Sequence, residues 1–212
     1  MGSDRNTVTL PICAAVLALI AIGCNRHKPE KMTFFVTSQP AGAGGAIGGL
    51  EGADAHCQRL AEAAGSKGRT WRAYLSAAAE GGKPAVNARD RIGRGPWFNA
   101  RGIRIAVSLE DLHSPNNHID RQTAFQEHGN RVIFPHDMLT GSNADGTLAD
   151  GDATCHNWTS TIGHAVLGHS DRQGGLGRDS DSWNSAHLSD GCTAKAFRST
   201  GGNGLFYCFA ID

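Results

Sequence analysis

The sequence lacks an excess of charge of either sign, since 20 Lys and Arg residues balance 20 Asp and Glu residues over 212 positions. Proteins that bind nucleic acid or an anionic membrane surface through their overall field carry a basic excess. We therefore predict that nucleic acid is not a partner. A repeat of fixed period is also absent, which excludes a solenoid or propeller.

Motifs of several enzyme classes are missing as well. No G-x-S-x-G, H-E-x-x-H or Walker loop occurs, so nothing fixes a serine hydrolase, zincin or nucleotide triphosphatase site. No cysteine pair has C-x-x-C spacing, which argues against a four-cysteine zinc site. The sequence predicts a non-catalytic protein.

A hydrophobic run long enough to span a membrane is absent from the start of the chain. The apolar run at residues 10–23 (LPICAAVLALIAIG) is shorter than the roughly 20 residues that a spanning helix needs. Arg5 precedes it and small residues end it, as in a secretory signal. Residues 21–24 (AIGC) resemble the bacterial lipobox, so we predict a signal peptide at residues 1–23 and lipidation of Cys24. A plain secretory signal with a chance cysteine is the alternative.

This leader divides the chain and gives it a location. Residues 24–32 form the lipidated N-terminus and a polar tether, and residues 33–212 form one domain. Acyl chains on Cys24 would be the only membrane contact, with the domain in water. Asn25 after the cysteine favours the outer membrane or cell surface; a periplasmic or secreted protein is the alternative.

The mature chain then has four cysteines, and an even number in an exported domain predicts two disulfides. Three connectivities are open. The stretch from residue 136 onward is rich in Gly, Asn, Asp and Ser. Core burial alone cannot order such a stretch, because glycine loses much backbone entropy on folding. We expect disulfides to hold it. The four cysteines are Cys57, Cys155, Cys192 and Cys208.

Hydrophobic periodicity predicts one main helix, at residues 52–64, with Cys57 on its inward face. Asp54 falls in the first turn of this helix, where the helix dipole favours a negative charge. The inward face consists of Ala53, Cys57, Leu60, Ala61 and Ala64.

The remaining segments read as short strands joined by loops. Residues 204–211 (GLFYCFAI) are apolar on both sides, so this strand should be central in its sheet. Residues 137–155 are expected to form a long loop. Further strands are expected at residues 33–38, 69–76 and 102–107, with short tryptophan-bearing strands at 155–160 and 182–184.

Several segments in this order carry a family resemblance: the GLEGADAHCQ helix, the WRAYLS strand, the LTGSNADGT loop, CHNWTS, SWNSAHLSDGC and LFYCFAI. They resemble bacterial endostatin-like lipoproteins of unknown function, some labelled lectins, over roughly residues 33–212. These are similar to the endostatin domain of collagen and to the C-type lectin-like fold. The resemblance implies an α+β, C-type lectin-like (endostatin-like) fold with a mixed sheet of short strands, long loops and nested disulfides, Cys57–Cys208 and Cys155–Cys192.

Calcium-dependent C-type lectins suggest a place for a ligand site. In them an acidic loop before the second cysteine meets a Trp-Asn-Asp strand before the third. Here the loop carries Asp145, Asp150 and Asp152, but Ser185 stands where the strand would have its aspartate. Losing a carboxylate weakens a calcium site, so solvated turn aspartates are the preferred interpretation. We predict no cofactor, with calcium as an alternative.

Ten histidines raise the question of zinc. His164, His169, Asp171 and His187 are near one another in sequence, but no pair of these histidines has helical i, i+4 spacing. We therefore expect surface or hydrogen-bonded histidines and no metal site.

Together these features predict a cell-envelope lipoprotein whose C-type lectin-like domain binds an extracellular ligand, either a glycan or a matrix or host protein. The host-protein option comes from the resemblance, since related lipoproteins of pathogens are associated with matrix and serum-protein binding. A structural envelope lipoprotein without soluble ligand and a metal-dependent hydrolase are the alternatives. The predicted ligand-binding residues are Asn143, Asp145, Trp183 and Asn184, with Arg89, Arg91 and Arg94 as a second, electrostatic group.

Overall fold

A computed structural model describes residues 1, 31–173 and 181–212 of the chain. The predicted signal peptide, the lipidation site Cys24 and most of the tether lie outside the described residues. Within the described part, no helix is both long enough and apolar enough to cross a membrane.

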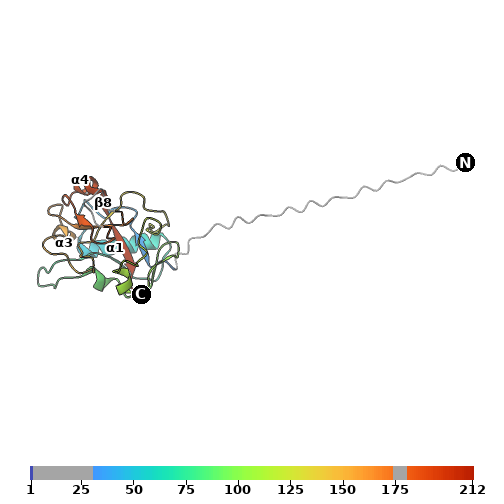
Figure 1. Cartoon of the computed structure of the whole chain (residues 1–212), viewed down its shortest axis with the longest axis horizontal. Helices are drawn as coiled ribbons and strands as arrows, with labels where there is room; N and C mark the ends of the chain where they lie inside the picture. Colours follow the sequence, from blue (N-terminus) through green and yellow to red (C-terminus); the bar gives the residue numbers. More distant parts are fainter. Residues whose placement is uncertain (2–30, 174–180) are drawn as a thin grey trace.

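Regular structure is sparse, and the elements are joined by long loops (Figure 1). The helices are α1 (Gly49–Ala63), α2 (Leu109–Leu112), α3 (Cys155–Trp158) and α4 (Ala194–Thr200), with a 3-10 helix at Ala88–Arg91. The strands are β1 (Phe34–Val36), β2 (Trp71–Ala73), β3 (Trp97–Phe98), β4 (Arg104–Ala106), β5 (Asp137–Leu139), β6 (Val166–His169), β7 (His187–Leu188) and β8 (Gly202–Ala210).

Six strands form one mixed sheet in the order β1-β8-β5-β6-β7, and β2 also pairs with β8. β5 and β8 are parallel, whereas the other pairs are antiparallel. β3 and β4 form a separate antiparallel pair. The predicted α+β class with a mixed sheet of short strands is therefore confirmed.

β8 is the central strand, as its apolar sequence predicted. β1, β2 and β5 all hydrogen-bond to it. Leu205, Tyr207 and Phe209 belong to the hydrophobic core on one face of the sheet, and Phe206 and Cys208 belong to the core on the other. A strand with both faces buried needs apolar side chains at every position, which this segment supplies.

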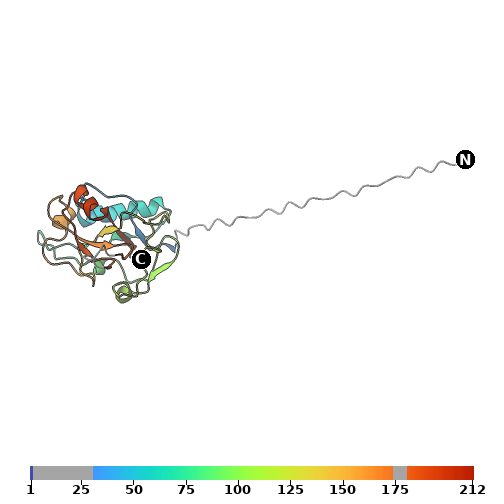
Figure 2. The same ribbon diagram turned by 45° about the horizontal axis from the view of Figure 1, so that its top comes forward.

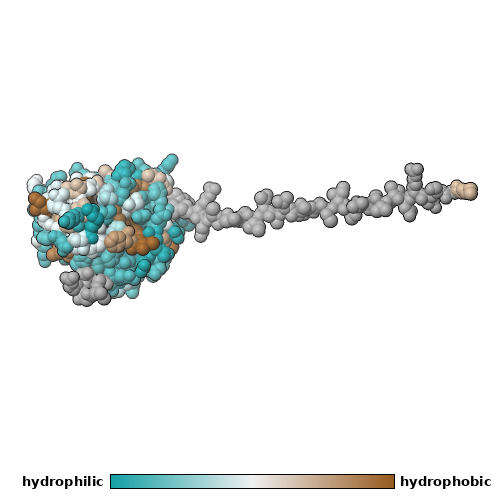
Figure 3. Space-filling model, turned by 90° about the horizontal axis from the view of Figure 1, so that it is seen from above, coloured by the Kyte–Doolittle hydropathy of each residue, from teal (hydrophilic) through white to brown (hydrophobic). Residues whose placement is uncertain are grey.

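Each face of the sheet has its own cover. α1 and α4 pack on the face of Phe206 and Cys208, and Figure 2 shows both helices on the same side of the strands. The opposite core is closed by Trp97 of β3, Ile105 of β4 and Leu112 of α2. The face of the domain in Figure 3 is mostly hydrophilic, with scattered hydrophobic residues.

α1 has the predicted inward face but a different start. Ala53, Cys57, Leu60 and Ala61 are buried, as the helical spacing required. The helix begins at Gly49, three residues before the predicted start, so Asp54 is not in the first turn. That prediction was wrong, and the acidic residue of the first turn is Glu51.

Two nested disulfides join the chain, Cys57–Cys208 and Cys155–Cys192, so the predicted pairing is confirmed. They close stretches of 151 and 37 residues. In the chain-entropy model such closures destabilise the unfolded state by about 5 and about 4 kcal/mol. Disulfides are typical of exported proteins.

Three segments differ from the sequence predictions. Asp137–Leu139 is strand β5, not the start of a long loop. Residues 182–184 are not a strand. Cys155–Trp158 is a helical turn rather than a strand, because its backbone takes the left-handed conformation. β5 depends on its pairing with β6 and β8, and the turn at Cys155–Trp158 depends on its disulfide to Cys192.

Candidate functional site

The three predicted arginines do not form one basic surface. Arg89 donates from Nη1 to the carbonyl of Asp145, at 2.9 Å. Arg91 is buried and pairs with Asp54. Arg94 is exposed and lines a cavity that neither Arg89 nor Arg91 lines. A single electrostatic patch built from all three is therefore not supported by their positions.

Of the predicted loop residues, Asn143 and Asp145 are exposed. Asp145 Oδ1 accepts hydrogen bonds from the Thr147 amide and hydroxyl, at 3.0 and 2.6 Å. These bonds lower the pKa of Asp145. The aspartate thus orders its own turn and keeps a charge at the surface.

Trp183 and Asn184 lie beneath that loop, with relative exposures of 3% and 1%. Asn184 Nδ2 donates to the carbonyls of Asn143 and Ala144, at 3.0 and 3.2 Å. A ligand at the molecular surface would not contact these two side chains. Trp183 and Asn184 instead support the loop of Asn143 and Asp145 from the interior of the domain.

Asn184 is also part of a buried chain of hydrogen bonds. Its Nδ2 donates to Tyr74 Oη at 2.9 Å, and Tyr74 Oη lies 2.8 Å from His113 Nε2. His113 Nδ1 lies 2.8 Å from the carbonyl of Leu109, which can only accept, so Nδ1 carries the proton. Burial lowers the pKa of His113, which favours the neutral ring that Tyr74 donates to.

The acidic residues considered for calcium do not converge. Asp152 Oδ2 pairs with His156 Nδ1 at 2.9 Å, while Asp145 orders its own turn. Among the residues that the structure describes, Asp145, Asp150 and Asp152 are not part of any group of three side chains close enough to share an ion.

The most unusual backbone of the described chain is the turn α3. Its four residues, Cys155 to Trp158, have φ values of 51°, 51°, 53° and 65°, although none is glycine. Left-handed helical backbone costs roughly 1–2 kcal/mol per residue for an L-amino acid. The turn therefore stores strain that its surroundings must offset.

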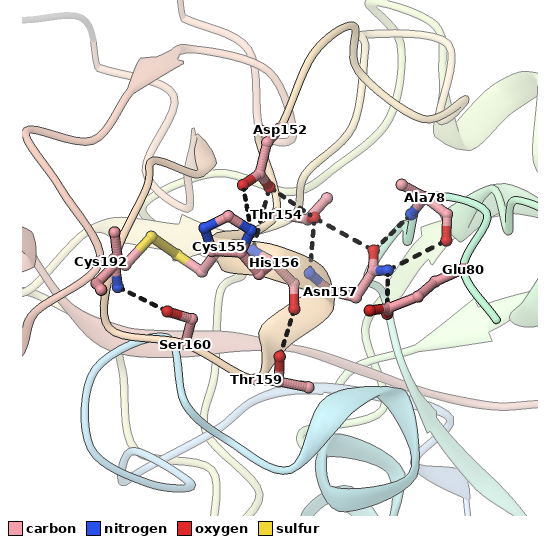
Figure 4. Close-up of polar contacts among 11 residues, drawn as sticks. Ala78, Glu80, Asp152, Thr154, Cys155, His156, Asn157, Thr159, Ser160 and Cys192 are labelled. Carbon is pink, nitrogen blue, oxygen red and sulfur yellow. Dashed lines mark hydrogen bonds and ion pairs between the residues drawn. A yellow bond between two sulfur atoms is a disulfide. The ribbon is translucent and has the colours of Figure 1, made fainter.

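The side chains of the turn provide those surroundings (Figure 4). Cys155 is held by its disulfide, and buried Trp158 donates from Nε1 to the carbonyl of Ser76 at 2.7 Å. Asn157 Oδ1 accepts from the amide of Ala78 at 2.6 Å, and Nδ2 donates to Glu80 Oε2 at 2.9 Å. Strained backbone held this firmly is concentrated at functional sites.

A cleft of about 580 Å³ opens beside this turn, a volume typical of ligand sites. Asn157 and Thr159 line it on one side, and the first residues of α1 line it on another. Its lining is Gly48, Gly49, Leu50, Glu51, Asp54, Ala77, Ala78, Glu80, Gly81, Lys83, Pro84, Val86, Arg91, Asn157 and Thr159.

Asp54 and Arg91 form an ion pair of 2.7 Å at the wall of the cleft, with side-chain exposures of 26% and 9%. Both also bind the backbone of Ala73: Asp54 Oδ1 accepts from its amide and Arg91 Nη1 donates to its carbonyl, each at 2.9 Å. Burial raises the pKa of Asp54, an effect that Arg91 opposes. The pair thus ties α1 to β2.

The exposed groups of the cleft are of mixed charge. Glu51 and Lys83 are exposed there, and the N-cap of α1 is Gly48, which has no side chain to accept from the helix amides. Helix amides of this kind attract oxygen atoms of a ligand. The cleft therefore offers donors and acceptors for a polar ligand.

A second cavity, of about 490 Å³, lies at Arg94. Trp97 and Phe98 line it together with Lys31 and Arg69. Arg69 donates to the carbonyl of Asp212 at 2.5 Å, so part of its positive charge is already engaged at the end of the chain.

The structure brings two of the histidines considered for zinc together with two residues that the sequence did not group with them. His169 and His187, both considered for zinc, lie beside His136 and Asp137. His164 is elsewhere, with Nδ1 2.9 Å from the carbonyl of Ser189. Helical spacing cannot reveal this group, because these residues meet through the pairing of three strands. The His136-Asp137 dipeptide was the available signal.

Comparison with protein-family models and with curated proteins finds no match to this chain. The resemblance to endostatin-like lipoproteins therefore stays a prediction drawn from the motifs of the sequence.

Proposed function

We propose that the domain is the C-type lectin-like binding module of an exported lipoprotein, and that it binds an extracellular ligand in the cleft beside α3 without catalysing a reaction. The nested disulfides, the long helix next to a mixed sheet and the long loops support this fold type. They also suit a domain that works outside the cytoplasm.

The observation that carries the proposal is a concave cleft with rigid walls. The strained turn of Cys155–Trp158 and its disulfide form one side, and the half-buried pair of Asp54 and Arg91 forms another. A site that is ordered before the ligand arrives loses less entropy on binding. This rigidity would account for the retention of a strained turn.

A glycan is the ligand class that the lining favours. Sugar hydroxyls both donate and accept hydrogen bonds, and the cleft presents carboxylates at Glu51 and Glu80 and an ammonium group at Lys83. A segment of a matrix or host protein is the other class, since a polar peptide offers similar groups.

The test is a glycan array and a matrix-protein panel, each probed with the full chain in detergent. Lys83→Ala and Glu51→Ala alter exposed groups of the cleft and should weaken binding at least tenfold. Asp145→Ala and Arg94→Ala, which alter the loop surface and the second cavity, should leave it unchanged. Binding that is lost only in these two would place the ligand elsewhere. A chain that binds nothing on either panel would favour a structural envelope lipoprotein.

A further inference from the structure

Four side chains converge where β5, β6 and β7 lie next to one another. Asp137 of β5 is directly opposite His169 of β6 in the antiparallel register. His187 of β7 is opposite Leu167, two residues before His169, so it lies on the same face of the sheet. His136 precedes β5, and its ring stacks on that of His169, with centroids 4.6 Å apart.

Two members of this cluster are buried with unsatisfied polar atoms. The side chains of Asp137 and His169 are 0% and 1% exposed. Among the described residues, no group makes a hydrogen bond of good geometry with either carboxylate oxygen of Asp137 or with either ring nitrogen of His169. Buried polar atoms are nearly always satisfied, and a buried carboxylate is costly unless a cation compensates it.

The neighbouring contacts show which way the ring nitrogens face. His136 Nδ1 lies 3.0 Å from Asp171 Oδ1, and a carboxylate oxygen accepts, so Nδ1 carries the proton. The other nitrogen, Nε2, lies 3.2 Å from Asp137 Oδ1. In the neutral ring this nitrogen is a lone pair directed at an anion, an arrangement that repels unless a cation lies between the two. If His136 carried a proton on both nitrogens, Nε2 could donate to Asp137. Both ring nitrogens of His169 would still have no hydrogen-bond partner among the described residues.

The distances fit one small ion. The ligand atoms of His136, Asp137 and His169 all lie within 4.8 Å of one another. His169 Nε2 is 3.6 Å from Asp137 Oδ1, and His187 Nε2 is 3.6 Å from Asp137 Oδ2. Nitrogen and oxygen ligands at 2.0–2.2 Å from a tetrahedral zinc ion are about 3.3–3.5 Å apart.

We propose that this cluster is a zinc site, with His136, Asp137 and His169 as ligands and His187 as the fourth. Asp171 would act as a positioning residue, because a carboxylate on the far nitrogen fixes the orientation of a ligating histidine. Three imidazoles and one carboxylate suit Zn²⁺ better than Ca²⁺ or Mg²⁺, which prefer oxygen ligands. His136, Asp137 and His169 are the three whose ligand atoms lie within 4.8 Å of one another, and with His187 of β7 drawn in as the fourth ligand the ion would join β5, β6 and β7.

The backbone of Gly201 lies directly against the proposed ligand atoms. A Cβ at residue 201 would lie 2.9 Å from His136 Nε2 and 3.3 Å from Asp137 Oδ1, and its φ is 113°. The backbone therefore approaches the proposed ligand atoms as closely as it can, and only glycine fits there. This site is separate from the cleft beside α3, and its test is independent of that function.

The experiment uses the full chain, purified in detergent without a histidine tag and treated with a chelator. Zinc is then titrated in competition with a chromogenic chelator, and bound metal is counted by mass spectrometry. We expect one zinc per chain and a melting temperature about 5–10 °C higher when free zinc is 100 times Kd. Cobalt should give the visible absorption of a tetrahedral site. Uptake well below one equivalent, with no thermal shift, would overturn the proposal.

Matched variants separate this site from zinc that adheres to the surface. His169→Ala and Asp137→Asn should weaken zinc binding at least 100-fold, and His187→Ala by 10–100-fold. His156→Ala removes an exposed histidine that pairs with Asp152 and should leave the affinity unchanged. Asp137→Asn should also fold at least as stably as the metal-free wild type, because it removes an uncompensated buried charge. Equal effects of His169→Ala and His156→Ala would contradict the assignment.

Discussion

Gly45 and Cys155 are packed so closely that a Cβ at residue 45 would lie 2.6 Å from the Cys155 sulfur. The amide of Gly45 donates to the carbonyl of Cys192 at 2.8 Å, so the loop contacts both halves of the inner disulfide. The glycine loop that follows β1 therefore allows the backbone to lie directly on this bond.

Gly45→Ala should destabilise the domain by about 2–3 kcal/mol, the upper part of the range for overpacking, because neither the backbone nor the disulfide can move aside. Urea unfolding measures the change. Gly191→Ala is the control, since a Cβ there meets Ala196 at an ordinary 3.4 Å. Equal effects of the two substitutions on the free energy of unfolding would show that the close contact at Gly45 does not determine stability.

His156 lies in the left-handed turn with a φ of 51°, so we predict that glycine is more stable than alanine at this position. His156→Gly should be more stable than His156→Ala by about 1 kcal/mol, because only glycine adopts this backbone without a steric cost. Both variants lose the exposed pair with Asp152, so this loss cancels in the comparison. Urea unfolding of the two variants tests the sign, and a more stable alanine variant would refute the strain.

The half-buried ion pair of Asp54 and Arg91 predicts a non-additive double mutant. Arg91→Met should cost about 2–3 kcal/mol, less than the 3–5 kcal/mol of a fully buried pair because Asp54 keeps some contact with water. Adding Asp54→Asn should recover part of this loss, since no charge then stays unpaired. A double variant less stable than Arg91→Met would contradict this account.

His113 predicts a dependence of stability on pH. Burial lowers its pKa in the folded state, so the unfolded chain takes up the proton first as the pH falls. The contribution of the neutral ring to stability is complete above pH about 6.5 and is lost below it, by at most about 1.4 kcal/mol per pH unit. His113→Gln, which does not titrate, should reduce the slope of unfolding free energy below pH 6.5. His118→Gln, at an exposed position, should retain it.

Features set by local pattern could be predicted from the sequence. The helical spacing placed Cys57 on an inward face, and the apolar run of residues 205–209, which supplies both faces, placed its strand at the centre of the sheet. The resemblance supplied the disulfide pairing. These features follow from side-chain periodicity and from the order of motifs, which a sequence displays directly.

Features that depend on contacts between distant parts of the chain could not be predicted from the sequence. Asp137–Leu139 is a strand because β8 and β6 pair with it. Its three residues alone do not predict a strand. The sequence predicts a strand at Cys155–Trp158, but the disulfide and the bonds of Asn157 hold it in a left-handed turn. His169 and His187 meet only across the assembled sheet.

The position of β8 also constrains how the protein is made. β1, β2 and β5 all bond to residues 202–210, which leave the ribosome after the strands that need them. Neither core can therefore close during synthesis, because each includes side chains of β8. A chain exported through a translocation channel would arrive unfolded and compatible with transport, then acquire its structure in one late step on the far side.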